Sequence, residues 1–168
     1  FERLVLAHLK DITGPLLDPL QFAYRANRSV DDAVNMGLHY ILQHLDKPGT
    51  YARILFVDFS STFNTIIPGT LLNKLTKLSI PTSICQWITR FLDRQAAAND
   101  ITVIGLIKDR DESAYRQEVE QLSVWCSHNN LELNTLKTVE MIVDFRRNPP
   151  ALPPLTIMDS TVAAVESF

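Results

Sequence analysis

The chain has 168 residues, of which 46% are hydrophobic and 21% are charged. That length supports one ordinary domain with a hydrophobic core, which argues against a disordered segment or a disulfide-stabilised mini-protein. A formal net charge of −3 argues against a uniformly basic protein that coats nucleic acid. Cys85 and Cys126 lack the spacing of a zinc site or a disulfide scaffold, so we expect two free, buried thiols.

Membrane insertion and secretion are not expected from this sequence. No apolar run approaches the roughly 20 residues that span a bilayer. The first ten residues, FERLVLAHLK, contain Glu2 and Arg3 and lack the apolar centre of a signal peptide. We therefore expect an intracellular protein, cytoplasmic or nuclear, with no membrane partner.

The apolar pattern predicts helices in the first part of the chain. Residues 1–12 form a short amphipathic helix, which ends before Gly14-Pro15 because proline disfavours helix at and just before its own position. Ser29 and Asp32 have the spacing of a capping box, so a helix is predicted over 30–46. Its apolar residues recur at helical spacing and predict one buried stripe: Val34, Leu38, Ile41, Leu42 and Leu45.

Two short apolar runs, YARILFVD at 51–58 and ITVIGLI at 101–107, predict buried strands. Between them, one helix is predicted to open at Pro68-Gly69 and another to follow Pro81. Residues 112–128 predict a further helix, whose inward-facing residues are Val119, Leu122, Trp125 and Cys126.

The last part of the chain predicts one strand and a linker. Residues 138–145 place Val139, Met141, Val143 and Phe145 in alternation with Glu140 and Asp144, as in a half-exposed strand. The proline-rich residues 148–154 predict a stiff linker, and 155–157 and 163–165 give weak strand signals. Strands interspersed with helices predict an α+β fold built on an antiparallel sheet.

Two carboxylates stand at the ends of the predicted strands. Asp58 ends the run at 51–58, and Asp100 immediately precedes the run at 101–107. We expect these side chains at one edge of the sheet, where two hard oxygen ligands suit Mg²⁺ if substrate phosphates supply the rest. Two such ions about 4 Å apart stabilise the entering and leaving oxygens in phosphoryl transfer. The alternative role of Asp58 is to cap the turn that follows the strand.

Three stretches resemble reverse transcriptases of LINE-type (non-LTR) retrotransposons. ARILFVDFSSTFNTI is similar to the first palm motif, LDPLQFAYRANRSVDDAVNMGLHYILQHLD to the finger-side block, and VWCSHNNLELNTLKTVEMIVDFRR to a later palm motif. The resemblance implies an incomplete polymerase palm, an antiparallel sheet backed by helices, with N-terminal finger helices. It divides the chain into finger-side helices at 1–48, a palm-like region at 49–147, and a proline-rich linker with the start of a lost downstream region at 148–168.

The resemblance also implies roles for individual residues. Asp58 matches the first metal-binding aspartate, and the backbone at Phe59 lies beside the second ion. Phe63 matches the bulky residue that blocks a ribose 2′-hydroxyl. Arg25 and Arg28 match a basic block that contacts template or incoming triphosphate, a use that suits guanidinium groups.

A later palm motif implies a further role for Lys137. This lysine and Asn134 lie in LNTLKT, and the family's lysine sits near the nucleotide phosphates and assists as a proton donor. Without the resemblance, Phe63 reads as an ordinary core aromatic, and Arg25, Arg28 and Lys137 read as solvated side chains.

The sequence departs from the family pattern near the second metal-binding strand. The family carries Phe-Ala-Asp-Asp there, whereas this chain has Ala97-Ala98-Asn99-Asp100. An amide oxygen can coordinate a metal ion but brings no charge, so a metal site made by Asp58, Asp100 and Asn99 is weakened. The family's Ser-Pro-Gln-Gly loop, which aligns template and nucleotide, has no counterpart in the sequence. These departures predict an internal deletion with its junction near 95–99, and a thumb region is also missing.

The expected function is therefore that of an internally deleted RNA-directed DNA polymerase. The family uses Mg²⁺ to add deoxynucleotides to a primer 3′-hydroxyl on an RNA template, and we expect little or no such activity here. The implied partners are RNA template, DNA primer and deoxynucleotide triphosphates, with self-association through an uncovered core. The alternative is a non-enzymatic remnant that binds nucleic acid or protein. Residues 1–98 carry ten basic against eight acidic residues, which supports it, whereas residues 99–168 carry six against eleven.

Overall fold

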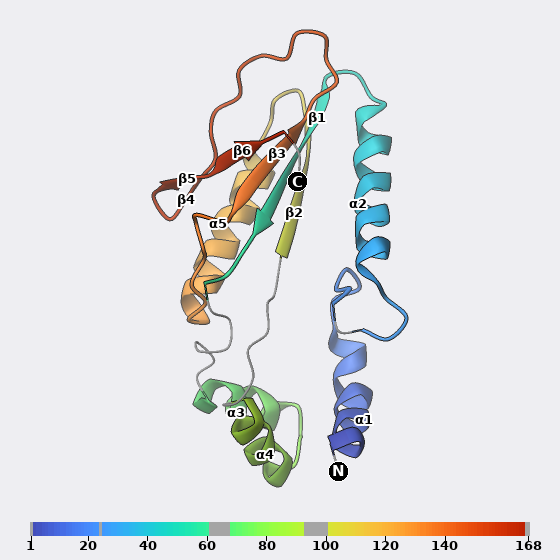
Figure 1. Cartoon of the computed structure of the whole chain (residues 1–168), viewed down its shortest axis with the longest axis vertical. Coiled ribbons are helices and arrows are strands. Elements are labelled where there is room, and N and C mark those ends of the chain that lie inside the picture. Colours follow the sequence, from blue (N-terminus) through green and yellow to red (C-terminus); the bar gives the residue numbers. More distant parts are fainter. Residues whose placement is uncertain (1, 24, 61–67, 93–100, 167–168) are drawn as a thin grey trace. The chain divides into compact units, whose positions relative to one another are not determined.

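The computed structural model describes residues 2–23, 25–60, 68–92 and 101–166, whose helices and strands form an α+β fold (Figure 1). The chain divides into two compact units. One contains Phe1–Gly37 and Ile67–Gln95, and the other contains Leu38–Ile66 and Ala96–Phe168. Within the described ranges, no helix is both long and apolar enough to cross a membrane.

The regular elements that the structure describes in the first unit are all helices. Its elements are α1 (Glu2–Thr13), the short 3₁₀ helix η1 (Gly14–Leu16), the first half of α2 (Val30–Leu45), α3 (Pro68–Lys77) and α4 (Thr82–Leu92). The capping box predicted for α2 is confirmed. The Asp32 N–H donates to Ser29 Oγ (3.1 Å), and the Ser29 N–H donates to the Asp32 carboxylate (2.8 Å). The Ser29 hydroxyl also donates to the Asp32 carboxylate at 2.8 Å, and this bond, together with that from the Ser29 N–H, lowers the pKa of Asp32.

The apolar stripe of α2 is only partly buried, which corrects the prediction from its spacing. Ile41 is buried against Ala52 and Ile54, and Leu45 packs beside it. Val34, Leu38 and Leu42 remain 53%, 48% and 53% exposed. Helical spacing identifies which residues share a face, but it does not show whether another element covers that face.

The turn after α2 connects this helix to the first strand of the sheet. Gly49 has a φ of +76°, a conformation that suits glycine because it has no Cβ. At the end of the helix, the Thr50 hydroxyl donates to the carbonyl oxygens of His44 (3.0 Å) and Lys47 (2.6 Å). The His44 carbonyl oxygen also accepts from the Lys47 N–H at 3.1 Å. Thr50 thus fixes the point at which the first strand begins.

The main sheet has the strand order β2-β1-β3-β6 (Figure 1). Its strands are β1 (Thr50–Val57), β2 (Ile101–Lys108), β3 (Val139–Val143) and β6 (Ala163–Val165). β2 and β3 run antiparallel to β1, whereas β6 runs parallel to β3. The sheet is therefore mixed, which corrects the expectation of an antiparallel sheet. A separate ribbon is formed by β4 (Thr156–Ile157) and β5 (Ser160–Thr161).

Helix α5 (Ser113–His128) covers one face of this sheet, and the second half of α2 packs on the other (Figure 1). α5 contributes Tyr115, Val119 and Cys126 to the core, together with the partly buried Leu122. Trp125 was expected in that core, but it is 49% exposed. Cys85 and Cys126 are free and buried, as predicted.

The prediction that β2 is buried is wrong for half of its residues. Gly105 and Ile107 are buried on the α5 side, whereas Thr102, Ile104 and Leu106 alternate with them and are exposed. A run of apolar residues without polar alternation suggested burial on both faces, but β2 lies at the end of the sheet.

Replacing Gly105 with alanine is expected to destabilise the strand-containing unit. A Cβ at this position would lie 2.5 Å from Cδ2 of Tyr115, whose ring packs directly on the glycine. Such overpacking typically lowers the free energy of unfolding by about 1–3 kcal/mol. Urea denaturation should show this loss for G105A. The double variant G105A/Y115L should recover part of it, and equal stability of G105A and the parent chain would contradict the close packing.

Candidate functional site

Asp58 immediately follows β1, at the edge of the sheet where the antiparallel β2 begins. Its side chain is 30% exposed, so solvent and small ligands can reach the carboxylate. The backbone here continues to pair after the strand ends. Phe59 forms a bridge with Leu133, and the Ser60 N–H donates to the Glu132 carbonyl oxygen at 2.9 Å.

The loop that precedes β3 holds Asp58 at several points. The Asn134 side-chain amide donates to Asp58 Oδ2 at 3.0 Å, and the Asn134 backbone N–H donates to the Asp58 carbonyl oxygen at 2.9 Å. Lys137 Nζ lies 4.0 Å from the same Oδ2. Because the Lys137 side chain is 74% exposed, this ion pair is weak. The carboxylate is thus oriented by the Asn134 amide and faced by the exposed ammonium group of Lys137.

Thr138 is a further contact that the sequence did not single out. Its hydroxyl accepts a long hydrogen bond of 3.4 Å from the Asp58 N–H, and the residue is only 2% exposed. The Thr138 N–H and the Lys137 N–H both donate to the Asn134 carbonyl oxygen, which closes the loop into a tight turn. The LNTLKT segment therefore folds as one unit against Asp58.

Asp58, Phe59 and Lys137 are the predicted site residues that the structure brings together. Arg25 and Arg28 belong to the helical unit. There Arg25 donates to the Asp18 carbonyl oxygen at 2.9 Å, and the Arg28 guanidinium lies 5.0 Å from the centre of the Phe22 ring. The predicted residues Phe63, Asn99 and Asp100 lie outside the described part of the chain.

A buried charge network lies beneath β1, on the α5 side of the sheet. The Arg53 guanidinium makes two hydrogen bonds to Glu140 of β3, at 2.8 and 2.7 Å, and one to Glu112 at 2.6 Å. Tyr51 and Tyr115 donate to Glu112 and Glu140 at 2.6 and 2.7 Å. Arg53 and Glu140 are 0% and 2% exposed. The network ties β1, which leads to Asp58, to β3 and α5.

Glu140 of this network corrects the prediction for β3. The alternation of residues 138–145 placed Glu140 and Asp144 on the solvent side, yet Glu140 is fully enclosed. The sequence did contain a signal for this arrangement. Arg53 interrupts the apolar run of β1, and a charge inside a buried strand requires an opposite charge beside it.

Burial and hydrogen bonding act in opposite directions on the ionisation of these groups. Burial opposes ionisation of Glu112, but hydrogen bonds from Tyr51, Arg53 and Arg116 outweigh it and lower the Glu112 pKa. Burial, together with the hydrogen bond to Glu112, raises the pKa of Tyr51 to about 12. Glu112 is therefore charged at neutral pH, and the phenol is neutral and donates its proton. These ionisation states hold the network together.

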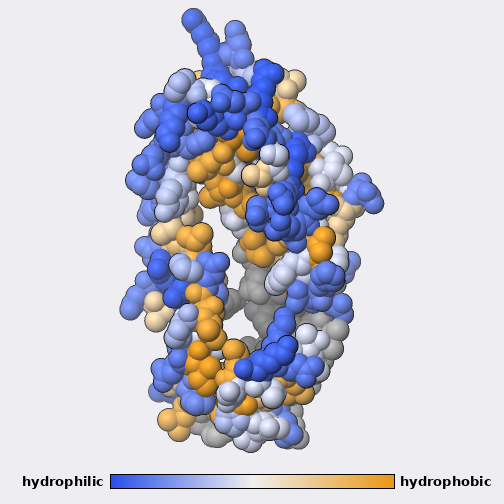
Figure 2. Space-filling view, turned by 180° about the vertical axis from the view of Figure 1, so that it is seen from behind, coloured by the Kyte–Doolittle hydropathy of each residue, from blue (hydrophilic) through white to orange (hydrophobic). Residues whose placement is uncertain are grey.

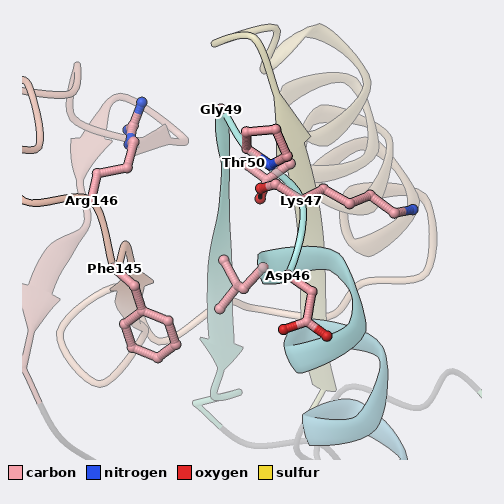
Figure 3. Close-up of a pocket in the computed structure, with 8 residues that line it drawn as sticks. Asp46, Lys47, Gly49, Thr50, Phe145 and Arg146 are labelled. Carbon is pink, nitrogen blue, oxygen red and sulfur yellow. Dashed lines mark hydrogen bonds between the residues drawn. The ribbon is translucent and has the colours of Figure 1, made fainter.

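A pocket of about 310 Å³ lies at the other end of β1, around the turn after α2 (Figure 3). Its lining includes Asp46, Lys47, Phe145 and Arg146. In Figure 3 the Lys47 side chain points away from Phe145 and Arg146. The Arg146 guanidinium is paired with Asp144 and stacks on Tyr51. β1 has eight residues and spans roughly 26 Å, so this pocket is remote from Asp58.

The Asp58 carboxylate is a hard oxygen ligand of the kind that Mg²⁺ takes. No group of three or more His, Cys, Asp or Glu side chains that could hold a metal ion occurs among the described residues. Mg²⁺ is commonly bound by one or two carboxylates, with phosphate oxygens and water as its other ligands. Asp58 can supply the first of these carboxylates.

Comparison with known proteins assigns the chain to a family. Residues 1–105 match the model of the family described as reverse transcriptase (RNA-dependent DNA polymerase). No curated protein and no solved structure is significantly similar to the chain. The matched stretch extends from α1 to Gly105, the fifth residue of β2. It includes Asp58, whereas Asn134 and Lys137 lie beyond it. Because the match covers more than half of the sequence, the chain belongs to the reverse transcriptase (RNA-dependent DNA polymerase) family.

Proposed function

We propose that the chain is an internally deleted palm-and-fingers piece of a LINE-type reverse transcriptase, and that it has little or no polymerase activity. The ancestral reaction adds a deoxynucleotide to a primer 3′-hydroxyl on an RNA template. The observation that carries the proposal is the contact of Asp58 with LNTLKT, because two stretches that resemble separate palm motifs meet at one carboxylate. In this proposal, residues 1–48 are finger-side helices and residues 49–147 are the palm.

The register of the sheet supports a second carboxylate in the same site. Val57, the residue before Asp58, is the pairing partner of Ile101. Asp100 directly precedes Ile101 in the sequence, so one peptide unit, about 3.8 Å between Cα atoms, connects it to the strand. Asp58 and Asp100 thus adjoin the same antiparallel pair, which favours a shared Mg²⁺ site.

Each residue has a distinct task in this site. When bound, Mg²⁺ supplies positive charge that stabilises the entering and leaving oxygens of phosphoryl transfer. The Asp58 carboxylate would bind the ion, and Asn134 keeps that carboxylate in place through the amide hydrogen bond. Lys137 is exposed enough to turn from Asp58 towards a bound triphosphate, where its ammonium group can give a proton to the departing oxygen. Phe63 is the proposed barrier to a ribose 2′-hydroxyl.

Two features of the sequence account for the expected lack of activity. Asn99 replaces a carboxylate, which removes one negative charge from the site, and loss of such electrostatic stabilisation commonly costs orders of magnitude in rate. The segment between Arg94 and Asn99 contains only Gln95 and three alanines, which leaves no room for the Ser-Pro-Gln-Gly loop. Template and nucleotide would therefore be poorly aligned even with Mg²⁺ bound.

Primer extension on an RNA template with Mg²⁺ tests the proposal. We expect product no greater than that of the Asp58→Asn variant, because the parent chain already lacks the charge and the alignment that the reaction needs. Robust extension by the parent chain that D58N abolishes would overturn the predicted inactivity. The same samples are titrated with salt for binding to primer–template duplex. Binding without extension, with affinity falling steeply as salt rises, would favour the nucleic-acid-binding alternative.

A further inference from the structure

Among the described residues, strand β2 has an open edge. Its eight residues pair with β1 along one side, and β2 is the last strand in the order β2-β1-β3-β6. On its other side, no strand of the described residues pairs with it. Near the end of β2, the side chain of His44 from α2 contacts the strand, with its Nε2 2.8 Å from the Ile107 carbonyl oxygen. Residues Ile101–Leu106 therefore present the open stretch.

This edge lacks the features that usually prevent strand pairing between molecules. Natural edge strands are commonly short or carry charges, prolines or bulges. β2 has no charged residue from Ile101 to Ile107, contains no proline, and keeps regular register with β1 along its whole length. β6, at the opposite end of the sheet, has only three residues. The uncharged edge of β2 is therefore the better template for another strand.

The exposed face of β2 adds an apolar surface to this edge. Ile104 and Leu106 are 37% and 42% exposed, and they lie on the sheet face where Ile41 packs. Leu38 and Leu42, on either side of Ile41 in α2, are about half exposed. In the space-filling view, hydrophobic residues reach the surface in the upper half, where α2 and the sheet lie (Figure 2). A partner strand would thus gain apolar contacts as well as backbone hydrogen bonds.

We propose that the occupant of this edge is the β2 strand of a second copy, paired antiparallel about a twofold axis. In such a pair, opposed residues lie on the same face of the joined sheet, so Ile104 and Leu106 of one copy meet the same apolar pair of the other. The absence of charge between Ile101 and Ile107 means that no like charges oppose each other in this stretch. A charged partner would find no complementary charge there. The inference does not depend on the proposed polymerase ancestry.

The oligomeric state in solution tests the proposal. Sedimentation of the whole chain over a concentration series should show a monomer–dimer equilibrium. Ile104→Lys places a charge on each copy at the contact and should weaken the dimer at least tenfold. Val124→Lys is the matched control, because Val124 is 50% exposed on α5, which packs on the opposite face of the sheet. V124K should dimerise like the parent chain.

Disulfide trapping gives a second readout that does not depend on the stability of a charged variant. Cys85 and Cys126 are 1% and 0% exposed, so an added surface cysteine is the reactive thiol. I104C, L106C and their equimolar mixture sample the three closest registers, and under mild oxidation at least one sample should form a disulfide-linked dimer. A monomer at every concentration, a dimer unaffected by I104K, or no trapped dimer in any of the three samples would each overturn the proposal.

Discussion

Arg53→Met should lower the free energy of unfolding by about 3–5 kcal/mol, the usual cost of removing one partner from a buried ion pair. Arg53 is completely buried and is the only side chain in the described structure that contacts both Glu112 and Glu140. Without it, Glu140 still accepts a hydrogen bond from the Tyr115 hydroxyl at 2.7 Å but has no opposite charge beside it. Since whole domains are stable by only about 5–15 kcal/mol, this loss is large. Urea denaturation followed by circular dichroism measures it.

Arg116→Met is the matched control for this substitution. Arg116 pairs with the same Glu112, at 2.7 Å, but its side chain is 36% exposed. Solvent screens that pair, so R116M should cost no more than about 1 kcal/mol. The double variant R53M/E140Q should recover part of the R53M loss, because the unpaired charge is gone. Equal losses for R53M and R116M, or strict additivity in the double variant, would contradict the role assigned to the buried network.

The stability of R53M should depend less on acidification than that of the parent chain. The lowered pKa of Glu112 stabilises the parent chain above the ordinary glutamate range of about 4.3, and this contribution is lost as the pH falls through the folded-state pKa. Between pH 7 and pH 5, the contribution of Glu112 to the free energy of unfolding of the parent chain should therefore change little. In R53M, Glu112 loses one of the hydrogen bonds that lower its pKa, so the loss of stability on acidification should be smaller than in the parent chain. Urea midpoints measured between pH 7 and pH 3 for both chains test this.

The sequence predicted the order of the main elements because local signals specify them. Helix α2 has its capping box at Ser29, and β1 is a short apolar run that ends at Asp58. It did not predict which faces are covered. The exposed Leu42 and the half-exposed Ile104 depend on where other elements pack, and nothing in their own periodicity reports that. Glu140 was misplaced for the same reason, since its partner Arg53 lies 87 residues away in the chain.

The candidate site, too, could be predicted from the sequence only in part. Motif resemblance brought Asp58 and Lys137 to attention, and the structure places their charged groups 4.0 Å apart. Thr138 carried no signal of its own, because a threonine at the start of a strand is ordinary. Its contact with the Asp58 N–H arises only when the LNTLKT turn folds against the end of β1.

Asn99→Asp should tighten Mg²⁺ binding at least tenfold, or about 1.4 kcal/mol. Asn99 and Asp100 precede β2, whose Ile101 pairs with Val57 beside Asp58. In the proposed site, the substitution would add a charged oxygen ligand with almost no change in side-chain size. Affinity for divalent cations spans orders of magnitude with the number of charged ligands. Titration calorimetry with Mg²⁺, and displacement of Mn²⁺ followed by its paramagnetic resonance, measure the change.

Two further variants make the Asn99→Asp result specific to the proposed site. Asn130→Asp adds the same charge at an exposed position outside the site, and it should leave Mg²⁺ affinity at the parent level. N99D/D58N removes one carboxylate as it adds the other, and its affinity should return close to that of the parent chain. If N99D and N130D bind Mg²⁺ equally, the residues before β2 do not share a metal site with Asp58. Primer extension by N99D should remain low, because restoring the charge does not restore the loop that aligns the template.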